Sequence, residues 1–294
     1  MIESNIYAFS ADNKPAAACK PGDTLEFKTM DCFTNQIKSE RDLVTDLDFS
    51  RVNPAAGPVF IEGAEAGDIL VVDILDITVA PQGVVATVPG SGPLIDTVEN
   101  RTKVIKVDGG KAKFNNLEFD AEPMIGVIGT APSVGSVPCG HPGRHGGNMD
   151  CKLIGKGARM FFPVNAPGAL LAMGDLHARM GDGELCCTGI EIPGAVTVKV
   201  DLIKDTVLEW PVLETADKWY TIACSFDYPE ALKFASLEMQ RLIRNAYGWD
   251  NTDCYLYLSL QGDVEICQGC MPCDVETVLR LGVPKTVGLP LIKY

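Results

Sequence analysis

The chain is poor in histidine and has no long apolar run. Its 294 residues include 3 histidines, and no segment reaches the about 20 consecutive apolar residues that a membrane helix needs. The first ten residues show neither the basic start nor the apolar run of a secretion signal. We therefore expect a cytoplasmic protein that does not enter a membrane.

Basic charge is scarce as well. The sequence has 25 Lys and Arg against 39 Asp and Glu, which gives a net charge of −14. Such a chain would repel nucleic acid and anionic membranes, so both are excluded as partners. Because 46% of the residues are hydrophobic, the chain can form a packed core. The acidity either serves solubility alone or suits a small neutral or cationic ligand.

The 11 cysteines are an odd number, and in a cytoplasmic protein we expect thiols rather than a disulfide framework. Four cysteines with apolar neighbours are predicted to be small core residues, namely Cys186, Cys187, Cys224 and Cys254. Cys267, Cys270 and Cys273 form a run with metal-ligand spacing that lacks a fourth cysteine. The run is either a cysteine-rich loop or a structural metal site completed by Cys254 or a partner chain.

Turn-bounded runs of β-branched and aromatic residues dominate the first two thirds of the chain and predict strands. They cover residues 24–30, 69–76, 102–107, 111–114 and 195–202, with a hairpin turn at 108–110. The sequence therefore predicts a mainly β protein, a β-sandwich of jelly-roll type. This region is predicted to cover residues 1–215 and to carry the active-site motifs.

A C-terminal α+β part is predicted for residues 216–294. Residues 228–247 have one apolar face at helical spacing. Asp227 can cap this helix, and Gly248 follows its end. Residues 255–260 alternate in polarity and predict a further strand. The tail over residues 278–294 is apolar for a terminus, so we expect it to pack on the body or on a second subunit in a C2 homodimer.

All three histidines fall within residues 141–177, among several acids. His141 and His145 lie in a glycine-rich segment that ends at Asp150. Such a loop can present catalytic groups and backbone N–H donors to an oxyanion. Histidine grouped with carboxylates suits a hydrolytic or metal site, although surface polar residues could also fall together without a shared role.

Two further positions extend this cluster. On a strand through residues 171–177, Asp175 and His177 would share one face and could bind a metal together. Glu184 follows a glycine-rich turn and begins an apolar run, where desolvation would raise its pKa and suit a general acid or base. A surface Asp–His pair and a plain hairpin turn are the alternatives.

Several segments resemble the acetamidase/formamidase family. HGGNMD at residues 145–150 and GDLHARMGDGE at 174–184 are specific when they occur together, and residues 53–77, 123–132 and 189–198 are similar as well. The likeness extends from about residue 21 to residue 260. It implies a β-sandwich with an added α+β part and a hydrolase that cleaves short amides such as formamide and acetamide to acid and ammonia.

The resemblance also implies a site. Asp150, His177 and Glu184 match its motifs, and Asp31 matches an early aspartate of the family. A divalent metal, zinc or calcium, is implied as cofactor. The predicted metal ligands are Asp31, His141, Asp150, Asp175 and His177, and the predicted catalytic residues are Glu184, Asp150 and His145. Glu184 would take a proton from water and pass it to the leaving nitrogen.

Three alternatives remain at this point. Cys151 or Cys186 could act as a nucleophile instead of an activated water. The chain could be a β-sandwich that binds a small molecule without turnover. It could also be a related hydrolase that acts on esters or cyclic amides.

Overall fold

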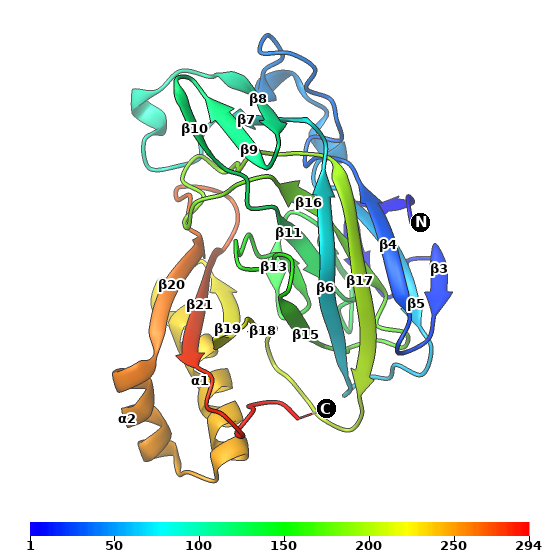
Figure 1. The fold of residues 1–294 in the computed structure, drawn as a ribbon, viewed down its shortest axis with the longest axis vertical. Coiled ribbons are helices and arrows are strands. Elements are labelled where there is room, and N and C mark those ends of the chain that lie inside the picture. The colour runs from blue at the N-terminus through cyan, green and yellow to red at the C-terminus, as the bar shows by residue number, and fades with distance from the viewer. Residues whose placement is uncertain (294) are drawn as a thin grey trace.

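The computed structural model describes residues 1–293 and is mainly β, as predicted (Figure 1). Its larger sheet is antiparallel, in the order β20-β21-β19-β18-β15-β6-β17-β4. These strands are β4 (Thr24–Thr29), β6 (Ile69–Val79), β15 (Arg159–Pro163), β17 (Gly194–Ile203), β18 (Val212–Glu214), β19 (Lys218–Ser225), β20 (Asp263–Gln268) and β21 (Thr277–Pro284).

A second sheet lies behind β6, β17 and β4 in the view of Figure 1. Its order is β1-β5-β16-β11-β14-β13, and β3 pairs with β5. These strands are β1 (Asn5–Ile6), β3 (Ala17–Cys19), β5 (Ala55–Ile61), β11 (Met124–Gly129), β13 (Pro142–Gly143), β14 (Gly146–Asn148) and β16 (Leu171–His177).

Smaller elements complete the β part. A short sheet in the order β10-β9-β8-β7 lies at one end of the molecule (Figure 1), and β12 pairs with β2. The bounds are β2 (Ala8–Ser10), β7 (Gln82–Ala86), β8 (Thr102–Asp108), β9 (Lys111–Phe114), β10 (Leu117–Asp120) and β12 (Ser136–Pro138). Single 3-10 turns are η1 (Val44–Asp46), η2 (Phe49–Arg51) and η3 (Ile95–Thr97).

The two large sheets share one core, as a sandwich requires. Val72 of β6 and Val198 of β17 belong to the same buried cluster as Ile128 of β11 and Met173 of β16. The predicted strands are confirmed as β4, β6, β8, β9 and β17, and the predicted turn at 108–110 joins β8 to β9. The runs of β-branched and aromatic residues between turns therefore located these strands.

The helix α1 (Tyr228–Tyr247) forms where it is predicted. The side chain of Asp227 accepts a hydrogen bond from the Glu230 backbone N–H, and Gly248 ends the helix at φ 74°. This left-handed conformation favours glycine. The buried face of α1 packs on β19 and β21.

The strand predicted at residues 255–260 is wrong, because this segment belongs to helix α2 (Asn251–Gln261). Asp250 caps the helix by accepting a hydrogen bond from the Asp253 N–H, and Cys254 and Leu258 are its buried residues. They are four residues apart and therefore lie on one helical face. A short run of alternating polarity does not separate a strand from a helix, whereas the capping aspartate does.

The larger sheet continues across the predicted boundary near residue 215. β18 and β19 lie on either side of this boundary and are hydrogen-bonded neighbours. The division into residues 1–215 and 216–294 therefore stays a prediction. In the tail, β21 is part of the sheet and Leu291 and Ile292 are buried, while Tyr294 lies outside the described residues. Within residues 1–293 no helix is both long and apolar enough to span a membrane.

Candidate functional site: a buried carboxylate cluster

The end of β16 places one imidazole against two carboxylates. The side chain of His177 is 1% exposed. Its Nε2 atom lies 3.2 Å from Glu191 Oε2 and 3.4 Å from Asp175 Oδ1. His177 and Glu191 also form an isolated β-bridge, which holds the two side chains together. Asp175 and His177 therefore share the site, as the strand pattern predicts.

Two more carboxylates approach the same imidazole from other segments. His177 Nε2 lies 3.8 Å from Glu184 Oε1 and 3.9 Å from Asp150 Oδ1. The amide of Gln268, at the end of β20, donates to Asp150 Oδ2 at 2.6 Å and to Glu184 Oε2 at 3.0 Å. The larger sheet thus supplies the group that holds these two carboxylates side by side.

The backbone of the cluster is strained. Asp150, Asp175 and Glu184 have φ angles of 42°, 53° and 44°, in the left-handed region that non-glycine residues rarely adopt. Gly126 of β11 provides the necessary room, because a Cβ atom there would lie 2.5 Å from Asp150 Oδ1. Strained residues that gather at one point are typical of functional sites.

Burial sets the charge state of the cluster. Burial, then the charges of Glu184 and Asp175, raises the pKa of Asp150 well above its usual value. Burial likewise raises the pKa of Glu184, and it raises that of Glu191 to about 8. For His177, burial opposes the imidazolium, but Glu191 and Asp175 outweigh it and raise the pKa. The cluster holds more carboxylates than positively charged groups. The single imidazole of His177 cannot neutralise all of these carboxylates.

Asp31 and Cys32 extend the cluster on one side. Asp31 is buried, and burial followed by the charge of Asp175 raises its pKa to about 6, although the Asn35 N–H opposes this shift. Ligand atoms of Cys32, Asp175 and Glu191 lie within 4.8 Å of one another. Burial, then the charges of Glu191 and Asp175, raises the pKa of the Cys32 thiol well above its usual value.

The donor set fits a divalent cation. Ligand atoms of Asp150, His177 and Glu184 lie within 4.8 Å of one another. Asp150 Oδ1, Asp175 Oδ1 and Glu191 Oε2 are buried atoms without a hydrogen-bond partner. Buried oxygens in this state are usually paired or bound to a metal. Carboxylate oxygens are ligands of both zinc and calcium, whereas an imidazole nitrogen is a ligand of zinc.

The other two histidines lie apart from the described groups that could share a metal. His145 packs edge-on against Phe9, and burial lowers its pKa to about 4, so its ring is neutral at pH 7. His141 is partly exposed, with Nδ1 3.5 Å from Glu276 Oε2. The glycine-rich segment that carries both is a short hairpin of β13 and β14 rather than an irregular loop. Their predicted roles stay predictions.

A cavity of about 710 Å³ lies beside the cluster. Cys32, Asn148, His141 and Gln268 are among its lining residues. Gln268 also bonds Asp150 and Glu184, so it links the cavity to the carboxylates. A small molecule in the cavity would therefore lie next to the cluster, which is the arrangement expected of a binding site.

Glu191, Gln268 and Cys32 are site residues that sequence reasoning missed. Glu191 and Cys32 each follow a predicted site residue closely along the chain, and that proximity was the available signal. Gln268 had no local signal, because it lies 84 residues from Glu184 and reaches it only through the fold of the larger sheet.

The two cysteines considered as nucleophiles occupy different surroundings. Cys151 is buried and its Sγ lies 3.9 Å from Arg280 Nη1. Burial raises the pKa of this thiol, but a hydrogen bond with Cys267 and the charge of Arg280 outweigh burial and lower it. Cys186 is half-buried and bonds the Thr188 carbonyl. Neither is among the residues with ligand atoms in the cluster.

Replacement of Asp31 by Asn is expected to stabilise the metal-stripped protein above pH 6. The unfolded chain ionises Asp31 near the model-peptide value of 3.8, whereas the folded protein keeps the proton until about 6. The free energy of unfolding therefore falls as pH rises from 3.8 to about 6. The loss is on the order of 3 kcal/mol at the upper end of this range. Urea unfolding at pH 5 and pH 7.5 measures the difference. An equal gain at both pH values would contradict the assigned cause.

The fold and the cluster define a β-sandwich protein with a buried polar centre beside a cavity. The chain belongs to the Acetamidase/Formamidase family, whose model matches residues 7–138 and 135–262. This confirms the resemblance seen in the sequence motifs.

Curated relatives carry the same names. A formamidase from Methylophilus methylotrophus is 30% identical over 257 residues, covering 67% of this chain and 63% of the relative. An acetamidase from Mycolicibacterium smegmatis is 30% identical over 261 residues, covering 66% and 64%. The chain thus spans less than two thirds of the length of these relatives.

Solved structures match over nearly the whole chain. An acetamidase from Bacillus halodurans has a TM-score of 0.92 at 39% identity and covers 96% of both chains. A predicted acetamidase/formamidase from Thermoanaerobacter tengcongensis has a TM-score of 0.92 at 44% identity, with 96% of this chain and 94% of that chain covered. A gamma lactamase from Delftia acidovorans, at 23% identity and a TM-score of 0.66, shares the fold.

Proposed function

We propose that this protein hydrolyses short aliphatic amides to a carboxylic acid and ammonia. The observation that carries the proposal is the buried group of Asp150, His177 and Glu184, with ligand atoms within 4.8 Å of one another, beside a cavity that can admit a small molecule. Relatives named formamidase and acetamidase support the substrate class.

Amide hydrolysis needs a proton acceptor that can later become a donor. Glu184 suits this role because burial raises its pKa toward the working range. Gln268 donates to Glu184 Oε2 at 3.0 Å, so we assign the proton taken from water to Oε1. The same carboxyl then gives the proton to the leaving nitrogen.

The cluster fits a divalent metal, zinc or calcium, as cofactor. Asp150 and His177 would hold it, and Asp175 lies near enough to His177 to contribute. When bound, such an ion would polarise the amide carbonyl and lower the pKa of a water molecule. Gln268 keeps Asp150 oriented toward the centre through its bond to Oδ2.

Ammonia release tests the proposal. Purified protein is expected to release ammonia from at least one of formamide, acetamide and propionamide in buffer supplied with divalent metal. Parallel reactions with a short ester and a cyclic amide separate an esterase or lactamase from an amidase. Binding of these amides without release of ammonia would instead identify a non-catalytic binding protein.

A C2 homodimer remains our proposal for the assembly. Tyr255, Leu256 and Leu260 of α2 are exposed apolar side chains, and such patches favour association. Light scattering at micromolar concentration is expected to give twice the mass of one chain. A monomer under these conditions would contradict the proposal. A cytoplasmic location likewise stays a prediction, which cell fractionation tests.

A further inference from the structure

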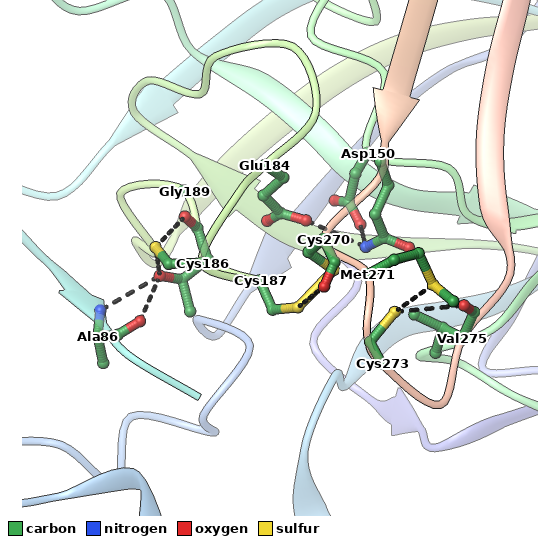
Figure 2. The surroundings of a disulfide bond; sticks show 12 residues. Ala86, Asp150, Glu184, Cys186, Cys187, Gly189, Cys270, Met271, Cys273 and Val275 are labelled. Atoms are coloured by element: carbon green, nitrogen blue, oxygen red, sulfur yellow. Dashed lines mark hydrogen bonds between the residues drawn. A yellow bond between two sulfur atoms is a disulfide. The ribbon is translucent and has the colours of Figure 1, made fainter. Parts of the chain in front are cut away.

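A disulfide joins the two segments that supply Glu184 and Gln268. Cys187 lies in the turn after Glu184, and Cys270 follows β20. Their Cα atoms are 5.5 Å apart, and the sequence separation is 83. Figure 2 shows Glu184 and Asp150 close to this bond. The bond corrects two expectations, because thiols were predicted throughout and Cys187 was predicted to be a core residue.

Cys187 occupies a conformation that suits glycine. Its φ is 60°, where a β-carbon is disfavoured. Strain of this kind persists only where the surroundings impose it, and it gathers at functional positions. Local folding alone therefore does not explain why this position holds a cysteine and not a glycine.

A third cysteine stands within reach of the bond. The sulfur atoms of Cys187, Cys270 and Cys273 lie within 4.8 Å of one another. Cys273 is a free, half-buried cysteine, and its Sγ contacts Met271 Sδ at 3.4 Å and the Val275 carbonyl at 3.3 Å (Figure 2). Cys187 and Cys273 both line the cavity beside the cluster, so small thiols can reach them.

We propose that Cys187, Cys270 and Cys273 form a thiol–disulfide exchange centre at the wall of the site. The thiolate of Cys273 attacks Cys270 Sγ, the Cys270–Cys273 bond forms, and the Cys187–Cys270 bond breaks. Cys187 leaves as a thiolate and takes up the proton that Cys273 gave up. No electrons enter or leave, so the exchange needs no external oxidant or reductant.

Exchange would change how firmly the Glu184 turn is held. Two hydrogen bonds also tie it to the strand end, from the Gly183 N–H to the Cys267 carbonyl and from the Gly269 N–H to the Gly183 carbonyl, both at 2.9 Å. Because these contacts remain, release of Cys187 is expected to lower kcat/KM for an amide several-fold rather than abolish turnover. This effect on rate rests on the proposed function, whereas the exchange itself does not.

Disulfide mapping of the full chain tests the exchange independently of activity. The protein is incubated without added thiol at pH 8, quenched in acid, alkylated and analysed by mass spectrometry. In the wild type, both the Cys187–Cys270 and Cys270–Cys273 bonds are expected, with nine alkylated cysteines in either state. C273S should show only Cys187–Cys270. C187G, whose new glycine suits the local φ, has no disulfide to exchange and should form Cys270–Cys273 only when oxidised glutathione is added as the oxidant. C186S, next to the bond but outside the trio, should behave like the wild type.

The outcomes separate the proposal from its rivals. If Cys187 stays linked to Cys270 in every wild-type molecule, the exchange does not take place and the proposal fails. A protein isolated with all three thiols reduced around one bound metal ion also overturns it. If mapping succeeds and no variant releases ammonia, the exchange stands and the proposed hydrolysis fails.

Discussion

Glu184→Gln is expected to lower the rate of amide hydrolysis by on the order of 100-fold or more while the fold persists. Glutamine keeps the shape of the side chain but cannot accept and return the proton. Removal of one buried carboxylate also relieves repulsion with Asp175, whose charge raises the Glu184 pKa. We therefore expect no loss of thermal stability. Steady-state ammonia release and circular dichroism measure the two effects.

An exposed glutamate provides the matched control. Glu65 lies on a surface turn, far in sequence from the site, so Glu65→Gln makes the same chemical change outside the cluster. It should keep the wild-type rate. A Glu184→Gln variant that also keeps that rate would remove Glu184 from the mechanism.

Loss of metal is the second large effect that we expect. Elemental analysis of the purified protein should find a divalent ion, and Asp150→Asn should lose it. Oδ1 of Asp150 is buried and has no hydrogen-bond partner, and an amide oxygen in its place is a weaker metal ligand than the carboxylate. Mutation of a residue that hydrogen-bonds to a metal ligand commonly lowers metal affinity or activity by roughly 10–100-fold. Loss of a direct ligand should lower them by at least as much. Chelation should lower ammonia release to a similar degree, and added zinc or calcium should restore it.

Two results would count against the metal. Asp12→Asn, an exposed counterpart, is expected to retain metal and activity, so equal loss in both variants would point to a general effect on folding. If the metal-free protein is fully active, water activation by an ion fails, and a cysteine nucleophile becomes the better mechanism.

Local patterns were enough to predict much of the fold. The strand β17 and the helix α1 form where β-branched runs and helical spacing place them. In both cases the signal lies within a few neighbouring residues. The error at α2 has the same origin, because alternating polarity over residues 255–260 is ambiguous and the deciding cap, Asp250, lies outside that run.

Part of the site was also predictable. Asp175 and His177 share one strand end, and Asp150 and Glu184 join them through the motifs that they belong to. Gln268 was not predictable, because its contacts with the cluster depend on how β20 approaches the second sheet. The side-chain geometry at His141 and His145 likewise follows from the β13–β14 hairpin rather than from spacing.

The sequence by itself determined the mainly β class, the long helix, the family and four polar residues that meet in the buried cluster. These follow from short-range periodicity, capping and compact motifs, which act between residues close along the chain. The tertiary structure alone decided that Gln268 bridges Asp150 and Glu184, that Glu191 contacts His177 and Cys32 borders the cluster, and that Cys187 pairs with Cys270. Those contacts join residues far apart in sequence, so they exist only once the sheets have packed and buried the carboxylates together.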